Sequence, residues 1–571
     1  MEILNLIQLL LALLAARVAL TILANRLSIP APLILVPAGV ILGFIPWFPR
    51  FELNPDVVLS IFLPPLIYTG SVSAWNAVQK NIRPIFLLSF GLVLFTMAFV
   101  ALAAHHLIPG ITWPIAFVLG AIIAPTDDVA AGTVVRKLSV PHRLVSVLEG
   151  EGLLNDATAL TAFQFAVAAV VSGSFHLERA IFAFFAMVVG EVAYGLLLGW
   201  VVSKVRQKLK DPSLELTVSF LTPFLAYLIP ERLGGSGVLA TAIAGLYIGS
   251  QSAKVFTLGV RLIGVPMWQL LVFIFNNFLF LVTGLQLRFV LGEVSDYSPA
   301  TLLYYGAVVS GVVILSRLVW VYPAAFLPRA FSASLRARDP MPPFRHIFIL
   351  SWIGMRGAIS LAAAFGIPAM TGSGSPFPYR GLIIFIAFCV ILSTLVLQGI
   401  TLPPLIRWLG IDRDGEQERK GAHYQETLAR LEAAKAALQE IDTWEKEGVC
   451  STEIAEHLRH LYEKQIRKLD RHRDEESDDA FGHLSKKETE LQLKVLDTER
   501  NKILELYDQG VIADDVLRLI VLDLDLQEMR LRQNAHLDPD SPLKRNAQRL
   551  GAANQPLRRS KEGPAEKGNG K

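Results

Sequence analysis

Four carboxylates stand inside apolar stretches of this chain that are long enough to cross a lipid bilayer. They are Asp127 and Asp128 in the segment AIIAPTDDVAAG, and Glu151 and Asp156 in the segment LEGEGLLNDATAL. An ionisable side chain near the centre of a bilayer costs at least ~2.5–3.5 kcal/mol on insertion scales. These acids therefore need a partner or a function, and the chemistry open to a buried carboxylate is the binding of a cation or a proton.

The composition separates a membrane domain from a charged tail. Of the 571 residues 53% are hydrophobic and 18% are charged, which excludes an ordinary soluble protein. Residues 1–410 carry a net charge of +9, and residues 411–571 carry −6. We therefore predict a membrane domain over 1–410 and a water-soluble domain over 411–571. Only two cysteines are present, so neither a disulfide framework nor a multi-cysteine metal site is expected.

Hydropathy predicts an all-α membrane protein with thirteen spans. With the N-terminus outside, the loops on the cytoplasmic side hold sixteen Lys and Arg residues and the opposite loops hold five. This asymmetry places the C-terminal tail in the cytoplasm. The predicted spans are 4–24, 32–48, 56–75, 84–107, 112–135, 144–172, 179–203, 214–230, 236–252, 263–287, 300–327, 345–370 and 379–409.

Thirteen spans divide as six, one and six, which permits two six-helix repeats of inverted topology. The span with PTDD is then equivalent to the span with SWIGMRGAIS. Both carry Pro or Gly at mid-span beside a charge, a pattern typical of broken helices that cross at a midplane site.

The charged residues of three spans reach a similar depth. At ~1.5 Å per residue, Asp156, Asp127 and Arg356 lie ~17–22 Å into a core ~30 Å thick. On a helical wheel Gly152 lies about 40° from Asp156, and Glu151 about 140° from it. We therefore expect open space at Gly152 beside Asp156, and an ion pair between Glu151 and Arg356, because a buried guanidinium cannot lose its proton.

Pro125 is predicted to interrupt its helix just before Thr126 and Asp127. Carbonyls freed by the break, the Thr126 hydroxyl and the Asp127 carboxylate together suit a hard cation, although Asp127 can also cap the helix that follows. Asn155 would hold Asp127 or line the site. Asp128 is expected to face the cytosolic funnel or a partner such as Arg136, and a direct role in ion binding stays open.

Two further charges inside spans, Glu191 and Arg317, can pair with each other or reach the interface, and the sequence does not decide between these.

The buried acids suggest a mechanism in which a proton and a cation compete for one carboxylate. A carboxylate in a partly desolvated cavity can exchange a proton for a metal cation. If Asp156 binds one or the other and never both, this competition couples opposite fluxes.

Four segments, FLPPLIYTGS, PTD, GEGLLNDA and GMRGAIS, occur in an order and spacing that resemble the monovalent cation/proton antiporters of the NhaP type and the animal sodium/proton exchangers. The resemblance covers residues 1–410. It implies a secondary-active antiporter, not an enzyme, that exchanges Na⁺, or K⁺ or Li⁺, for H⁺. It also implies a homodimer, an elevator-like movement and electroneutral one-to-one exchange, with no cofactor and no nucleic-acid partner.

The resemblance also assigns roles to residues. Asp156 would bind the cation or the proton, with Asp127 as a second ligand of the cation, Thr126 and Asn155 would support the site, and Glu151 with Arg356 would form a structural ion pair. This sequence departs from the pattern at three secondary positions. Thr69, after Tyr68, stands where many relatives have an acid, Gly152 stands where they have Ser, and Asp128 stands where Pro or Ala is common.

The tail is predicted to form helices over 416–448, 451–469 and 485–533, to be disordered from about 546, and to bind a regulatory partner.

An alternative function is a cation channel gated by this tail, but the sequence lacks repeated carbonyl filters or a ring of like pore residues. Short loops favour a bacterial inner membrane, with lipid as a partner. The first tail helix has one apolar stripe, formed by Leu428, Leu431, Ala434, Leu438 and Ile441.

Overall fold

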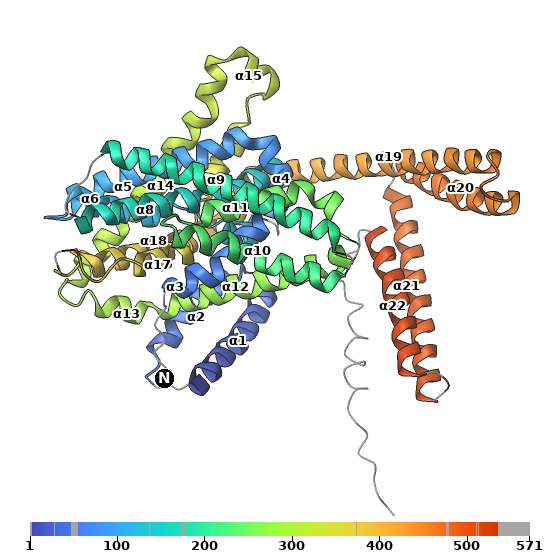
Figure 1. The fold of residues 1–571 in the computed structure, drawn as a ribbon, viewed down its shortest axis with the longest axis horizontal. Coiled ribbons are helices and arrows are strands. Elements are labelled where there is room, and N and C mark those ends of the chain that lie inside the picture. The colour runs from blue at the N-terminus through green and yellow to red at the C-terminus, as the bar shows by residue number, and fades with distance from the viewer. Residues whose placement is uncertain are drawn as a thin grey trace, which may run out of the picture. The chain divides into compact units, whose positions relative to one another are not determined.

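A computed structural model gives the fold of the chain (Figure 1). It describes residues 3–27, 29–46, 55–135, 138–172, 177–209, 211–257, 259–372, 374–474, 479–509, 511 and 513–534. In these ranges the chain is helical, and its only bridge of β type joins Met370 and Pro376. The fold is therefore all-α, as predicted. The predicted disorder from about 546 lies outside the described residues.

Twenty-two α-helices and three π-helical segments make up the described chain. They are α1 (Ile3–Arg26), α2 (Pro32–Phe44), α3 (Pro55–Val57), η1 (Val58–Phe62), α4 (Leu63–Phe86), η2 (Leu87–Leu92), α5 (Val93–Leu107), α6 (Trp113–Ile123), α7 (Asp128–Val135), α8 (His142–Ser172), α9 (Leu177–Lys208), α10 (Pro212–Arg232), α11 (Val238–Val255), η3 (Val260–Gly264), α12 (Val265–Leu285), α13 (Leu287–Gly292), α14 (Pro299–Phe331), α15 (Ala333–Arg338), α16 (Phe344–Trp352), α17 (Ala358–Phe365), α18 (Arg380–Trp408), α19 (Ile411–Lys446), α20 (Thr452–Asp474), α21 (Asp479–Asp508) and α22 (Asp514–Asn534).

Eight helical stretches within the described ranges are long and apolar enough to cross a membrane. Two shorter apolar helices, Pro32–Phe44 and Val238–Ser252, coincide with the predicted spans 32–48 and 236–252. The count differs from thirteen partly because two predicted spans, 56–75 and 84–107, fall in one stretch, Pro55–Leu107. Within it Asn81 leaves helical geometry (φ −124°, ψ 26°), so the helix kinks there but does not end. The number of thirteen spans stays a prediction.

Two predicted spans are broken at the expected places. The span with PTDD divides into α6 and α7, and the span with SWIGMRGAIS divides into α16 and α17. Pro125 lies in the first break and cannot donate a backbone hydrogen bond. Gly354 and Gly357 lie in the second, where Gly357 has extended backbone geometry. The inverted-repeat relation between the two spans stays a prediction.

Helices α2 and α12 pack with their backbones in close contact. A Cβ atom on Gly39 would lie 2.2 Å from the carbonyl oxygen of Leu281, and one on Gly284 would lie 2.1 Å from that of Val36. Only glycine fits at such distances, and small residues are the usual means by which helices approach closely inside a membrane. The pair therefore forms one tightly packed element.

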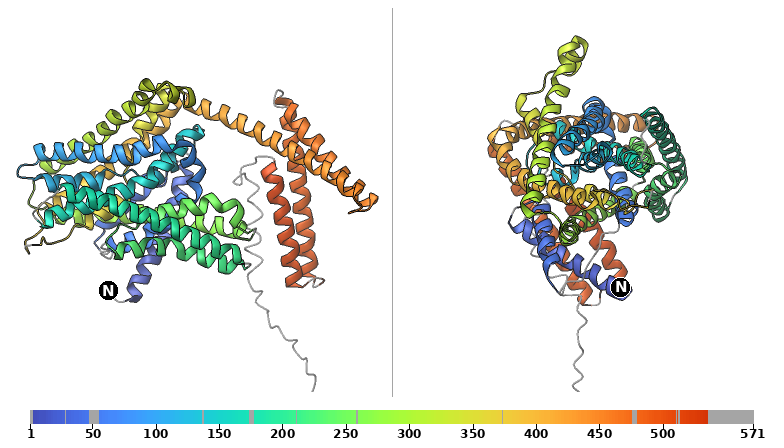
Figure 2. Two further views of the ribbon diagram at one scale, coloured as in Figure 1. Left: turned by 45° about the horizontal axis from the view of Figure 1, so that its top comes forward. Right: turned by 90° about the vertical axis from the view of Figure 1, so that its left-hand side faces the viewer.

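The chain divides into two compact units, residues 1–419 and 420–571. In the second unit, α19 and α20 form a hairpin, and α21 and α22 form another (Figures 1 and 2). Arg459 of α20 pairs with Asp442 and Glu445 of α19. The predicted helix over 485–533 is two helices in the structure, α21 and α22.

Candidate functional site

The two helix breaks are in direct contact within the first unit. The backbone N–H of Asp127 in the first break donates to the carbonyl oxygen of Met355 in the second at 2.8 Å. Helix α18 satisfies two more backbone amides of the second break: Gly354 donates to Gln398 Oε1 and Arg356 donates to Thr394 Oγ1, both at 3.1 Å. Backbone groups freed by the breaks thus find partners without water.

Asp127 caps the helix that begins at the break. Its Oδ1 accepts hydrogen bonds from the backbone N–H groups of Val129 and Ala130, each at 3.0 Å. Its Oδ2 faces Gly357, where a Cβ atom would lie only 1.9 Å away. The capping role considered from the sequence is therefore present, and one carboxylate oxygen stays outside the cap.

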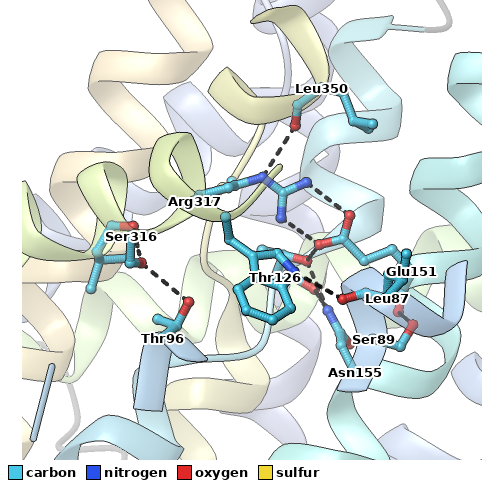
Figure 3. Close-up of polar contacts among 12 residues, drawn as sticks. Leu87, Ser89, Thr96, Thr126, Glu151, Asn155, Ser316, Arg317 and Leu350 are labelled. Carbon is cyan, nitrogen blue, oxygen red and sulfur yellow. Dashed lines mark hydrogen bonds and ion pairs between the residues drawn. The ribbon is translucent and has the colours of Figure 1, made fainter. Parts of the chain in front are cut away.

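A chain of polar contacts joins Asn155 to Glu151 through Thr126 (Figure 3). Asn155 Nδ2 donates to the carbonyl oxygen of Thr126 at 3.0 Å and to its Oγ1 at 2.8 Å. Thr126 Oγ1 in turn donates to Glu151 Oε1 at 3.0 Å. Asn155 thus holds Thr126, not Asp127, and its own Oδ1 is buried without a hydrogen-bond partner.

Glu151 has a different partner from the predicted Arg356. Arg317 of α14 reaches it with both terminal nitrogens: Nη1 pairs with Oε1, and Nη2 donates to Oε2 at 2.8 Å (Figure 3). Both side chains are only 2% exposed. A planar guanidinium matches a carboxylate in this two-bond arrangement, so the pair is fully formed without Arg356.

Arg356 is buried at 1% exposure, and its Nε and Nη1 have no hydrogen-bond partner. Among the described residues no acid lies within ion-pair distance of it, although it lies in the electrostatic field of Glu151. The helical wheel placed Glu151 away from Asp156, but it could not tell which of two deep arginines meets it. Glu191, the other undecided charge, accepts from the backbone of Ser236 at 2.6 Å and not from Arg317.

Asp156 lines a cavity of about 550 Å³ and is 8% exposed. In the described part of the chain its carboxylate has no hydrogen bond and no ion pair. The charged groups that act on it are both acids, Asp128 and Asp127. Since unpaired buried charge is costly, this carboxylate needs a proton or a cation.

Most of the site residues predicted from the sequence line this cavity. Thr69, Thr126, Asp127, Asp128 and Gly152 line it with Asp156, while Asn155 supports it from behind through Thr126. Carboxylate and hydroxyl oxygens are ligands that hard cations prefer. No group of three or more His, Cys, Asp or Glu residues arranged to hold a metal ion occurs in the described ranges.

The expected open space at Gly152 is filled. A Cβ atom there would lie 2.4 Å from Cβ of Asp128, so the glycine admits the Asp128 side chain beside α8. The glycine at residue 152 therefore provides the space that the additional acid at residue 128 occupies. Sequence reasoning also missed Gln269 and Asn276 of α12, which line the same cavity. Their polarity on an apolar helix was the available signal.

Known proteins are similar to this chain over most of its length. Residues 10–408 match the family described as sodium/hydrogen exchanger, transmembrane. An uncharacterized Na⁺/H⁺ exchanger of Mycobacterium tuberculosis is 34% identical over 92% of this chain and 96% of its own length. The sodium, potassium, lithium and rubidium/H⁺ antiporter of Bacillus pumilus is 34% identical over 66% of this chain and 58% of its own length.

The fold also matches a solved structure. The sodium proton antiporter MjNhaP1 from Methanocaldococcus jannaschii superposes with a TM-score of 0.57 at 21% identity, over 72% of this chain and 100% of that chain. At this identity the match supports the fold alone. The family match spans most of the chain and includes both broken helices and the cavity between them, so this protein belongs to the sodium/hydrogen exchanger family.

Proposed function

We propose that this protein exchanges a monovalent cation for a proton across a bacterial inner membrane, with Asp156 as the shared binding group. One observation carries the proposal. Of the two buried acids on α8, Glu151 is neutralised by Arg317, whereas Asp156 faces a cavity with no hydrogen bond or ion pair among the described residues. Asp156 is therefore the carboxylate available for a substrate.

Exchange follows from the cost of an empty site. An ionised carboxylate in a water-poor cavity is unfavourable unless a cation or proton neutralises it. The loaded states are then the ones that change access from one side of the membrane to the other. A single carboxylate that carries either one Na⁺ or one H⁺ gives electroneutral one-to-one exchange. Thr126 and the free oxygen of Asp127 would complete the shell of the cation, and Asn155 would fix Thr126 in place.

The crossing of the two breaks suggests which parts move together. The hydrogen bond from Asp127 to Met355 and the bonds from the second break to α18 tie α6, α7, α16, α17 and α18 to one another. We propose that these helices and α8 form the mobile body of an elevator-like movement in a homodimer. Cytoplasmic placement of the tail and its regulatory role belong to the same proposal.

The test is cation-driven collapse of an imposed proton gradient in proteoliposomes, read with a pH-sensitive dye. Na⁺, K⁺ and Li⁺ are added in turn to the wild type, to Asp156→Asn and to Asp296→Asn, which removes an exposed acid remote from the cavity. We expect the wild type and Asp296→Asn to respond to at least one cation and Asp156→Asn to respond to none. A response of Asp156→Asn equal to that of the wild type would rule out Asp156 as the shared site.

Stoichiometry is tested in the same vesicles. With the membrane potential clamped by an ionophore at different values, electroneutral exchange proceeds at the same rate. A rate that follows the imposed potential would contradict one-to-one exchange, and would leave the role of Asp156 to be judged from the substitution alone.

A further inference from the structure

A second cavity, separate from the cation site, lies where α4, α8, α14 and the start of α16 meet. Its volume is about 410 Å³, within the range of small-molecule sites. The deeper wall is apolar, with Leu87, Leu144, Val147, Val321 and Leu350. The cavity thus offers a ligand an apolar environment.

Three arginines from three different helices gather at this cavity: Arg83 of α4, Arg143 of α8 and Arg329 of α14. Asp339 lies among them. It pairs with Arg329 at 2.5 Å and with Arg143 at 2.6 Å, but its distance to Arg83 Nη1 is 3.7 Å. Asp339 therefore satisfies two of the arginines and leaves the third without a hydrogen bond.

Arg83 is the arginine of this group that has no carboxylate at hydrogen-bond distance. Its Nη1 and Nη2 are buried and have no hydrogen-bond partner. Glu418 also lines the cavity, and its Oε2 accepts the backbone N–H of His142 at 3.0 Å. Three guanidinium groups against the carboxylates of Asp339 and Glu418 leave one net positive charge, and the two terminal nitrogens of Arg83 have no hydrogen bond.

Large apolar side chains are exposed beside this cationic group. Ile82 is 64% exposed and Phe86 56% exposed, on either side of Arg83 in the sequence, and Phe331 and Phe344 are 86% and 70% exposed. Phe331 and Phe344 flank the segment that carries α15, which projects from the end of α14 (Figure 1). An arginine flanked by exposed apolar side chains can contact lipid head groups with its guanidinium while its neighbours contact the acyl chains.

We propose that this cavity binds an anionic phospholipid, with Arg83 at the lipid phosphate and part of an acyl chain between Leu87, Val147 and Val321. Charge complementarity selects an anionic group, and the apolar wall selects an amphiphile over a small ion. The membrane around the protein supplies such lipids at high local concentration. A bound lipid would join α4, α14 and α8, the helix that carries Asp156.

The experiment measures thermal unfolding of the purified, delipidated full-length protein in detergent, through its tryptophan fluorescence. The probes are phosphatidylglycerol, phosphatidylcholine and inorganic phosphate. We expect only phosphatidylglycerol to raise the Tm in a saturable way, with retention of the lipid visible by native mass spectrometry. An equal effect of phosphatidylcholine, or of inorganic phosphate, would overturn the proposal.

Substitutions locate the site. Arg83→Gln should need about tenfold more phosphatidylglycerol for the same shift, because it loses a charged hydrogen-bond donor to the phosphate; a tenfold change corresponds to about 1.4 kcal/mol. The matched control Arg336→Gln removes one exposed arginine of α15 and should respond as the wild type does. Ala324→Phe, which fills the apolar part, should lose the response while keeping every arginine. A wild-type response in either Arg83→Gln or Ala324→Phe would refute the assignment.

Discussion

The buried pair of Glu151 and Arg317 predicts a specific pattern of stability in single and double variants. Both oxygens of Glu151 are engaged by Arg317, and each side chain is 2% exposed. Removing one partner of such a pair leaves the other charge buried and costs about 3–5 kcal/mol. Glu151→Gln and Arg317→Gln should each lose this amount, and the double variant should lose about 2–3 kcal/mol less than the sum.

Substitution of Arg356 tests whether Arg317 is the true partner of Glu151. Arg356 is equally buried but has no hydrogen bond to Glu151, so Arg356→Gln should cost less than Arg317→Gln, and its coupling with Glu151→Gln should be well below that of Arg317. Thermal unfolding in detergent measures all five variants. At about 2 °C per kcal/mol, a single loss in the pair corresponds to about 6–10 °C. Coupling of Glu151 to Arg356 that equals or exceeds its coupling to Arg317 would refute this reading of the site.

Three further outcomes are expected. Gly357→Ala places a Cβ atom 1.9 Å from Asp127 Oδ2 and should reduce exchange more than tenfold, whereas Gly311→Ala, which has open space in α14, should leave exchange unchanged in the same vesicle assay. Gly152→Ala must displace the Asp128 side chain, so it should raise the cation concentration for half-maximal exchange several-fold and lower the Tm by about 2–6 °C. An unchanged half-maximal concentration would show that Asp128 does not shape the site. Burial of Asp339 opposes its ionisation, but Arg143 and Arg329 outweigh this and hold its pKa below the ordinary value of 3.8, so its stabilisation is fully present above that pH and is lost as the pH falls through the lowered pKa. The Tm difference between wild type and Asp339→Asn should therefore be constant from pH 5 to 8 and shrink below about pH 3.8, and a change within pH 5 to 8 would contradict this account.

The helix breaks could be predicted because their causes are local. Pro125 removes a backbone donor wherever it stands, and the glycines around Arg356 weaken a helix in any context. The charged residues of α8 could be recognised because their cost depends only on their depth in the membrane.

The pairing of these charges could not be predicted, because it depends on how separate helices pack. Arg317 and Arg356 are both deep, and only the three-dimensional arrangement brings Arg317 to Glu151. The same holds for Gly152. A helical wheel places it near Asp156, but the side chain that fills its space comes from residue 128, on another helix. Asn81 lies between the predicted spans 56–75 and 84–107, where hydropathy does not distinguish a helix that kinks from a helix that ends.

The separation of Glu151 and Arg317 along the chain bears on how the protein is made. The two residues are 166 positions apart. At ~5–20 residues per second, a ribosome needs roughly 8–33 s to add Arg317 after Glu151. During that interval α8 has no counter-ion for its glutamate, and entry of a charged carboxylate into the bilayer costs about 2.5–3.5 kcal/mol. Glu151 must therefore enter protonated or wait beside the insertion machinery, since its ion pair with Arg317 can form only after α14 has been synthesised.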